Sequence, residues 1–372
     1  MSGQLRILVS GMLAGSPGQG GATWALLQYI LGFQRLGHVV HFVEQMPERR
    51  EESARYFDHV VDAFGLRSVA SLLDSEGTIG PPYDEVLDWA RSADVLVNIS
   101  GLLQGELATH SPVRVYLDVD PGFTQLWHAV EGIDMRLDGH THFVTVGQSI
   151  GCEGCEIPTC DREWLPTLQP VVLDEWPAES EMLHDAFTSV GNWRGYGSIE
   201  HDGVRYGQRA HSFRELFELP ERTEKSLLLA LAIHPEEQKD LAALRASGWS
   251  MLDPTLVAAT PHDYRKFVAG SRGELGVAKS GYVNSRCGWF SDRSCCYLAS
   301  GRPVLAQDTG FSAHLPVGAG LLAYSSIEGA VAGLDEMRRN YEEHAAAARA
   351  LAEEHLDSDR VLTRLLELVH AA

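Results

Sequence analysis

The chain has 372 residues, which at about 150 residues per domain favours two domains and excludes a single small binding module. Hydrophobic residues make up 44%, charged residues 22% and aromatic residues 8%, a composition that excludes a disordered or collagen-like chain. The formal net charge of -21 repels phosphate polymers and anionic membranes, so we expect neither nucleic acid nor a membrane as a partner.

The N-terminal 21 residues do not have the pattern of a signal peptide. They contain one arginine and a short apolar run before a glycine-rich loop, and no later segment is long enough to span a bilayer. Six cysteines are too few for a disulfide scaffold. We therefore expect a cytoplasmic protein with reduced thiols.

The chain opens with the pattern of a strand, a loop, a helix and a second strand. The apolar run at residues 6–11 predicts a buried strand, and a glycine-rich loop follows at 11–21. A helical stripe at 22–36 precedes a second apolar run at 38–44. Parallel strands joined by a crossover helix form a βαβ unit, so the first half is predicted to be a Rossmann-like sheet.

Three more apolar runs extend this sheet, at residues 95–100, 113–118 and 143–147. The stretch 158–177 holds four prolines, which break regular structure, and is predicted to be a domain linker.

The alternation of strands and helices restarts after the linker. The tail from residue 327 onward is rich in alanine, glutamate, leucine and arginine and predicts two or three helices. The predicted domains are 1–175, 176–355 and a C-terminal helix in 356–372. The predicted strands of the second half are 187–193, 227–233, 275–279, 303–307 and 320–324, with helices at 235–247, 261–270 and 292–300.

The loop at 11–21 leads into a helix N-terminus, where free N–H groups and the helix dipole favour an anion. Gly20 and Gly21 are therefore candidate phosphate-binding positions. A dinucleotide-binding motif would require a third glycine where Thr23 stands, although Glu44 ends the second strand at a suitable distance. A turn without a ligand stays an alternative.

The segment from Arg265 to Arg302 contains seven basic residues and only two acidic ones. Such a cluster suits a diphosphate, because arginine binds phosphate oxygens in a bidentate manner. Lys279 and Arg293 are the candidates within it, together with Ser291 and Ser294 at the start of the predicted helix. The alternative is a solvated face of scattered arginines.

The segments ASGRPVL (299–305), QDTGF (307–311) and LPVGAGLL (315–322), the helical tail and the opening GQGGATW loop resemble GT-B glycosyltransferases of the group 1 type. The resemblance implies an α/β fold in which two Rossmann-like domains face a cleft, followed by a helical C-terminal tail. It implies that the second domain binds a nucleotide-diphosphate sugar and that the first domain holds the acceptor. It also implies that a final helix, here 358–370, crosses back onto the first domain.

The chain departs from that family at two places. Many relatives carry two glutamates that hold the donor, and the aligned residues here are Gly288 and Cys296. Inverting relatives often have a histidine after the first strand, and the loop at 11–21 has none. A base must come from another part of the chain, or the enzyme retains configuration without one.

Asp118 and Asp120 are the candidate catalytic residues, because they follow a buried strand and active-site groups collect at the carboxyl ends of strands. We expect Asp120 to deprotonate or orient the acceptor hydroxyl and Asp118 to position the loop. A pair of turn-forming aspartates is the alternative. Asp-x-Asp also resembles the metal motif of the other major glycosyltransferase fold, but two Rossmann-like halves argue against that fold.

Two weaker candidates complete the set. Arg194 follows the first strand of the second domain, where relatives place a phosphate-binding residue. Cys152, Cys155 and Cys160 could hold zinc with a fourth ligand, but reduced structural thiols are the preferred interpretation, and no metal or cofactor is expected.

The predicted function is a metal-independent glycosyltransferase of natural-product biosynthesis with a small-molecule acceptor; a homodimer stays open. The alternatives are a sugar-nucleotide epimerase or hydrolase, an inactive sugar-nucleotide-binding partner protein, and, with less support, a nicotinamide-dependent dehydrogenase. The sequence does not identify the nucleotide, the sugar, the acceptor or the stereochemical outcome.

Overall fold

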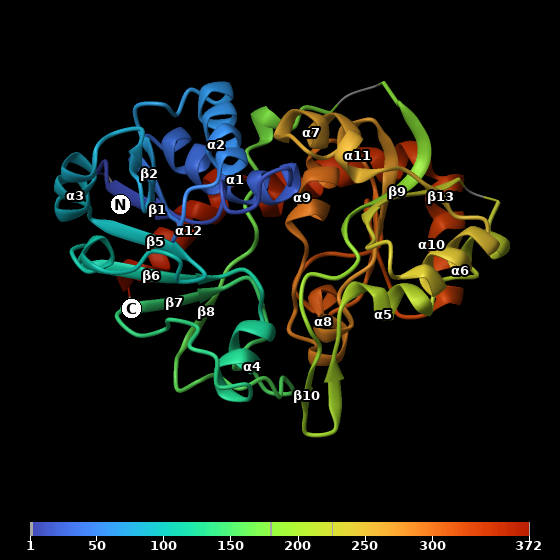
Figure 1. Ribbon diagram of the computed structural model, residues 1–372. Helices are drawn as coiled ribbons and strands as arrows, with labels where there is room; N and C mark the ends of the chain where they lie inside the picture. The colour runs from blue at the N-terminus through green and yellow to red at the C-terminus, as the bar shows by residue number, and fades with distance from the viewer. Residues whose placement is uncertain (1–2, 179–180, 225, 372) are drawn as a thin grey trace.

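The computed structural model describes residues 3–178, 181–224 and 226–371, which form two α/β halves (Figure 1). The first half contains an eight-stranded sheet in the order β4-β3-β2-β1-β5-β6-β7-β8. The second contains a six-stranded sheet in the order β13-β12-β9-β14-β15-β16. The prediction of two Rossmann-like domains followed by a helical tail is confirmed.

All strand pairs of the first sheet are parallel except β3 with β4. Ile7, Leu8 and Val9 of β1 are fully buried, since helices cover both faces of a parallel sheet. The elements of this half are β1 (Arg6–Ser10), α1 (Gly20–Arg35), β2 (Val39–Gln45), α2 (Glu51–Ala63), β3 (Ala70–Asp74), β4 (Gly77–Ile79), α3 (Tyr83–Arg91), β5 (Val95–Ile99), η1 (Glu106–Ala108), β6 (Val113–Asp118), α4 (Phe123–Ala129), β7 (His142–Thr145) and β8 (Trp164–Pro166).

The second sheet is parallel throughout, and a small antiparallel hairpin, β10 with β11, projects from it (Figure 1). Its elements are β9 (His184–Asn192), β10 (Ile199–His201), β11 (Val204–Tyr206), α5 (Arg209–Arg214), η3 (Leu219–Arg222), β12 (Leu227–Ala232), α6 (Gln238–Ala246), β13 (Ser250–Met251), η4 (Pro254–Leu256), α7 (Pro261–Ala269), β14 (Ser271–Gly276), α8 (Ser280–Ser285), α9 (Asp292–Ala299), β15 (Val304–Gln307), η5 (Phe311–Ala313) and β16 (Leu321–Tyr324). The tail is α10 (Ile327–Arg339), α11 (Tyr341–Leu351), a π-helical turn (Ala352–Leu356) and α12 (Ser358–Ala371).

Two sequence predictions need correction. The strand predicted at 275–279 lies instead at Ser271–Gly276, because its charged residues interrupt the apolar run that predicts a buried strand. One of them, Glu274, is buried and forms an ion pair with Arg293. The predicted linker at 158–177 contains a strand, β8, which pairs with β7 through Trp164 and Phe143. The hairpin and helices α2, α3 and α4 were not predicted.

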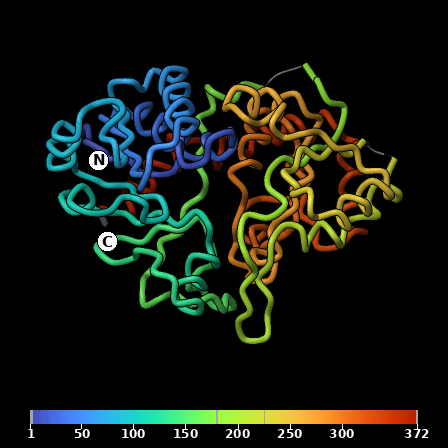
Figure 2. Tube along the Cα trace, in the orientation of Figure 1, coloured from blue at the N-terminus to red at the C-terminus, as the bar shows by residue number. Residues whose placement is uncertain are grey.

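The chain crosses between the halves twice, and the two crossings lie side by side. The amide of Val171 donates to the carbonyl of Leu356 at 2.8 Å, and the amide of Ser358 donates to the carbonyl of Val171 at 2.9 Å. Figure 2 shows the C-terminal segment, in red, returning to the half in which the blue N-terminal segment lies. There α12 packs against α1 and β6. The boundaries at 175 and 355 stay predictions.

The N-terminus of α1 is in direct contact with the second half. The indole of Trp24 donates to the carbonyl of Pro261, the first residue of α7, at 2.8 Å. One hydrophobic cluster runs from the first sheet through α1 to α7 and α9. Within the described part of the chain, every helix is too short or too polar to cross a membrane.

Candidate active site

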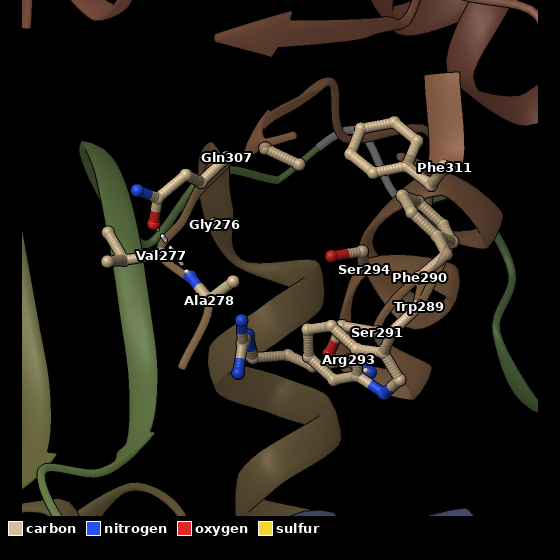
Figure 3. Close-up of a pocket in the computed structure, with 11 residues that line it drawn as sticks. Gly276, Val277, Ala278, Trp289, Phe290, Ser291, Arg293, Ser294, Gln307 and Phe311 are labelled. Atoms are coloured by element: carbon tan, nitrogen blue, oxygen red, sulfur yellow. Dashed lines mark hydrogen bonds between the residues drawn. The ribbon is translucent and has the colours of Figure 1, made fainter. Parts of the chain in front are cut away.

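A small pocket lies at the carboxyl ends of β14 and β15 in the second half (Figure 3). Trp289, on its rim, forms an isolated bridge with Gly147, which follows β7, so the pocket adjoins the first half. The pocket is lined by Gly276, Val277, Ala278, Trp289, Phe290, Ser291, Arg293, Ser294, Ala306, Gln307 and Phe311. Three of the predicted donor-binding residues, Ser291, Arg293 and Ser294, therefore lie together.

Helix α9 begins at this pocket. The hydroxyl of Ser291 accepts from the amide of Arg293 at 3.2 Å and caps the helix. The Arg293 guanidinium turns toward Glu274, with 2.5 Å between Nε and Oε1, and also donates to the carbonyl of Val190. Glu274 is fully buried, and its second carboxylate oxygen has no hydrogen-bond partner among the described residues. Arg293 is thus held by a buried ion pair.

Arg209, at the start of α5, is a pocket-side cation that the sequence analysis missed. Its Nε donates to the carbonyl of Val277 at 3.0 Å and its Nη1 to that of Asn192 at 3.2 Å, and no described carboxylate is hydrogen-bonded to it. A Cβ at Gly191 would lie 2.3 Å from Nη1, and the φ of +143° at this residue also favours glycine. Burial and then the charge of Arg293 lower the pKa of Arg209. Its two hydrogen bonds go to backbone carbonyls, so its guanidinium suits binding of an anion.

Asp120 and Lys279 meet across the two halves. The Lys279 ammonium lies 3.1 Å and 3.0 Å from the two carboxylate oxygens of Asp120. The hydroxyl of Tyr196 donates to Oδ2 at 2.5 Å, and that of Tyr282 donates to Oδ1. Burial lowers the pKa of Lys279, and Asp120 opposes that effect. The two predicted residues are brought together, but they are bound to each other.

Asp118 plays a different part from Asp120. Its fully buried carboxylate accepts hydrogen bonds from Thr124 at 2.7 Å, Gln125 at 2.9 Å and Thr145 at 2.8 Å. It also accepts from the amide of Asp120 at 3.1 Å. Burial raises the pKa of Asp118, while these donors oppose the shift. These hydrogen bonds suit the predicted role of Asp118 in positioning the loop. That Asp118 contributes to catalysis stays a prediction.

Aromatic rings surround the Asp120 and Lys279 pair. Lys279 Nζ lies 5.1 Å, 4.3 Å and 5.0 Å from the ring centroids of Phe123, Tyr196 and Tyr282. Tyr282 stacks on Trp289 at 4.2 Å, and Trp127 contacts Tyr196 at 4.5 Å. These rings connect the pair to the rim of the pocket and stabilise the ammonium through cation–π contacts.

Amides of the glycine-rich loop are already hydrogen-bonded to other groups of the protein. The carboxylate of Glu44 accepts from the amides of Leu13, Ala14 and Gly15 at 2.7 to 2.9 Å. The amide of Gly20 donates to the carbonyl of Ala258 at 2.8 Å, so it is not free for a phosphate. A Cβ at Gly21 would lie 2.8 Å from the Tyr264 ring. The structure shows Gly20 and Gly21 in close packing between the halves, and phosphate binding by them stays a prediction.

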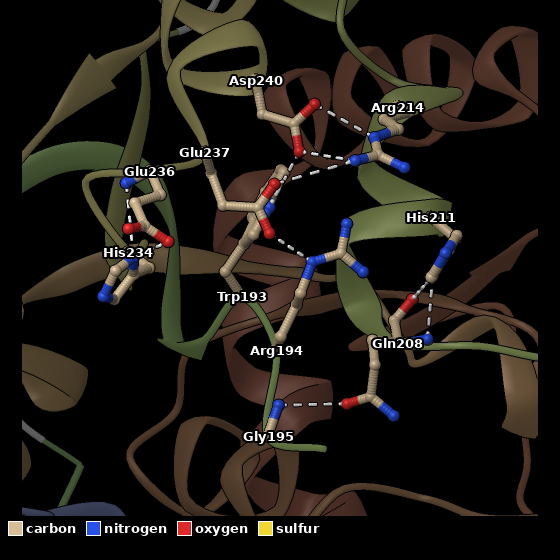
Figure 4. Close-up of polar contacts among 10 residues, drawn as sticks. All are labelled: Trp193, Arg194, Gly195, Gln208, His211, Arg214, His234, Glu236, Glu237 and Asp240. Atoms are coloured by element: carbon tan, nitrogen blue, oxygen red, sulfur yellow. Dashed lines mark hydrogen bonds and ion pairs between the residues drawn. The ribbon is translucent and has the colours of Figure 1, made fainter. Parts of the chain in front are cut away.

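Arg194 belongs to a separate polar network (Figure 4). Its guanidinium pairs with Glu237, while Asp240 accepts hydrogen bonds from Arg214 and Trp193. Arg194 is thus bound to Glu237 in this network, and it is not among the residues that line the pocket.

The basic residues between 265 and 302 do not form one surface. Arg265 pairs with Glu175 and Arg272 with Asp185, while Arg302 donates to the carbonyls of Ala269 and Glu181. Only Lys279 and Arg293 of this group lie at the pocket or the neighbouring pair. Spacing along the sequence could not show this, because several of the partners, such as Glu175, Asp185 and Glu181, come from distant parts of the chain.

Two of the three cysteines considered as zinc ligands, Cys155 and Cys160, lie against backbone carbonyls, while Cys152 is exposed. Cys155 Sγ lies 3.8 Å from the carbonyl of Ser285 and Cys160 Sγ 3.5 Å from that of Gln125. Among the described residues no three histidine, cysteine or acidic side chains are grouped to hold a metal ion. Whether the protein uses a metal or cofactor stays a prediction.

Comparison with known proteins shows the fold. No protein-family model and no curated protein matches the chain. An alpha-glucosyltransferase solved with UDP-glucose and DNA containing an abasic site matches with a TM-score of 0.59 and 14% identity, over 99% of this chain and 100% of that one. Anabaena HepE with UDP-glucose matches with a TM-score of 0.59 and 11% identity over the same shares. A glycosyltransferase from Rickettsia africae matches with a TM-score of 0.52 and 11% identity over 98% of each chain. The chain has the GT-B fold, as its sequence motifs predicted.

These structures also correct the expectation about partners. Solved structures of the alpha-glucosyltransferase contain DNA with an abasic site or a modified base. The prediction that nucleic acid is excluded and that the acceptor is a small molecule is therefore wrong. The exclusion of nucleic acid rested on the net charge of the whole chain, which averages over the surface and does not describe the potential at one cleft.

Proposed function

We propose that this GT-B chain is a glycosyltransferase that takes a sugar from a UDP-linked donor, with UDP-glucose as the first donor to test. Whole-length similarity to structures that hold UDP or UDP-glucose supports the donor class. The observation that carries the proposal is the placement of three cations just beyond the carboxyl end of β14: Arg209 donates to the carbonyl of Val277, Arg293 lines the pocket beside Val277, and Lys279 follows two residues later and meets Asp120 of the first half.

In the proposed reaction, the acceptor oxygen forms a bond to the anomeric carbon, and the bond from that carbon to the diphosphate oxygen breaks. The electron pair stays on the departing UDP. Arg209 and Lys279 stabilise its negative charge, because cations in a cleft with little water act strongly on developing charge. Asp120 receives or orients the proton of the acceptor hydroxyl.

The acceptor is sought among hydroxyl-bearing molecules that include DNA with modified bases, since structures of the same fold contain such DNA. Release of glucose from UDP-glucose without any acceptor would instead favour the hydrolase alternative. An epimerised donor would favour the epimerase alternative.

Calorimetric titration with UDP, GDP, dTDP, ADP and CDP tests the donor. We expect UDP to bind, and Arg209→Gln to weaken its affinity by about 10- to 100-fold, the effect of losing one or two charged hydrogen bonds. Arg205→Gln is the matched control, since Arg205 lies on the same segment but is 61% exposed. Absence of UDP binding to a folded protein would refute the donor proposal.

Replacement of Asp120 by Asn tests the proposed base. We expect turnover to fall by about 10²- to 10⁴-fold, the usual contribution of a general base, and thermal melting checks that the variant, which loses a salt bridge between the halves, is folded at the assay temperature. Asp138→Asn is the control, because Asp138 is 96% exposed and pairs only with Arg162 among the described residues. Unchanged turnover in Asp120→Asn would remove Asp120 from the mechanism.

A further inference from the structure

The hydrogen bonds to the Asp120 side chain all come from the opposite half of the molecule, within the part of the chain that the structure describes. Asp120 follows β6 of the first sheet, while Lys279, Tyr196 and Tyr282 follow or belong to elements of the second. The carboxylate therefore connects the two halves at the point where the proposed acceptor and donor sites meet.

Both charges of this pair are satisfied in the structure. The Lys279 side chain is 21% exposed and that of Asp120 23%, and the ammonium contacts two carboxylate oxygens, two hydroxyl groups and three ring faces. A lysine in this state offers no free charge to a diphosphate. An aspartate in this state already receives two hydroxyl hydrogen bonds and a salt bridge, so it is not available to an acceptor hydroxyl.

The positions of the neighbouring cations explain what can break the pair. Arg209 Nε donates to the carbonyl of Val277, two residues before Lys279, and the amide of Ser280, the residue after Lys279, donates to the carbonyl of Gln208, the residue before Arg209. A diphosphate bound at Arg209 therefore comes within reach of the same ammonium that Asp120 binds. Two phosphate charges compete with one carboxylate for it.

We propose that Asp120 is an internal substitute for the donor diphosphate: it occupies Lys279 in the free protein, and the donor must displace it. Displacement frees the Asp120 carboxylate for the acceptor, so the donor binds first and the acceptor second. This inference rests on the proposed function and adds an order of binding to it.

A double-mutant cycle on UDP affinity tests the competition. We expect Asp120→Asn to bind UDP about tenfold more tightly than the unmodified protein does. This is the gain if the pair of Asp120 and Lys279 is open in about one-tenth of the unmodified molecules. In the Lys279→Met background, the same Asp120→Asn change is expected to alter affinity less than about twofold. The dependence on Lys279 separates competition from the general effect of removing a negative charge.

Glu175→Gln provides the matched control. It removes the same charge from another ion pair that reaches the second half, Glu175 with Arg265, and is expected to leave UDP affinity unchanged. Thermal melting of each variant confirms that it is folded.

The outcomes distinguish the two proposals. Equal UDP affinity of the unmodified and Asp120→Asn proteins would overturn the competition and leave the UDP donor standing. A gain that persists in the Lys279→Met background would also overturn it. Failure of every folded variant to bind UDP would overturn the donor proposal, and the competition with it.

Discussion

Asp118 and Asp120 are two residues apart, yet their carboxylates have different surroundings. Asp118 is fully buried and accepts hydrogen bonds from its own half, while Asp120 reaches the opposite half. Asp118 lies within β6 and Asp120 in the loop beyond it, so one carboxylate is enclosed by its own sheet and the other is not. The two aspartates of the Asp-x-Asp motif therefore differ in role: Asp118 holds the local structure, and Asp120 is the candidate catalytic residue.

His41 gives the clearest pH dependence at the scale of a single residue. It is buried on β2 beside Ser71 and Trp89, and burial, assisted by the charge of Arg6, lowers its pKa to about 4. Between pH 6.5 and 4 the unfolded chain binds a proton that the folded chain does not. Stability is therefore expected to fall by about 3 kcal/mol as the pH decreases through this window, at 1.36 kcal/mol per pKa unit.

Urea unfolding of the unmodified protein and of His41→Gln at pH 7, 5.5 and 4 measures this effect. The variant should lose that part of the pH dependence, whereas His59→Gln, at an exposed position, should keep it. Identical pH profiles for the unmodified protein and His41→Gln would show that His41 is not the responsible group.

At the scale of elements, the contact between α1 and α7 depends on the absence of a side chain. A Cβ at Gly20 would lie 2.2 Å from the carbonyl oxygen of Thr260, the residue that caps α7, and 2.9 Å from that of Ala258. These are backbone atoms, which cannot turn away as a flexible side chain can. The glycine that suggested a phosphate-binding loop therefore permits two helices from different halves to touch.

Gly20→Ala is expected to destabilise the protein by about 1 to 3 kcal/mol, the usual cost of overpacking, despite the better helix propensity of alanine. Gly329→Ala is the control, because its Cβ would find its nearest atom at 3.5 Å in the first turn of α10. The control is expected to keep or slightly raise the melting temperature. If both variants melted alike, the contact between α1 and α7 would be dispensable.

At the scale of the whole molecule, α12 joins the end of the chain to its beginning. Its residues Val361, Leu362, Leu365, Leu366 and Val369 are all buried. It reaches the first half through the crossing at Val171 and Ser358. The first half therefore completes its core with a segment that follows the whole second half in the sequence.

A chain that ends at residue 357 is not expected to fold stably. Loss of five buried aliphatic side chains removes roughly 8 to 15 kcal/mol of burial free energy, as much as the whole stability of a typical domain. A chain that ends at residue 370 keeps all five and should melt like the full chain. Circular dichroism melting of the two chains checks this, and a cooperative, unshifted transition in the shorter chain would contradict it.

The fold class and most strands of the two sheets follow from patterns in the amino-acid sequence. The strand predicted at 113–118 is β6, and the helices predicted at 261–270 and 292–300 are α7 and α9 to within one residue. Such patterns are local, since an apolar run or a helical stripe depends on neighbours a few residues away. Motifs near the C-terminus also led to the GT-B fold.

Which charged side chains pair with each other depends on long-range packing. Asp120 and Lys279 are 159 residues apart, and Arg293 is paired with Glu274 and not left free. Arg209 gave no signal in the sequence beyond an arginine two residues after Gly207. The pairing of charges depends on which loops the two sheets bring to one edge, and this follows from packing between distant segments, which no local pattern records.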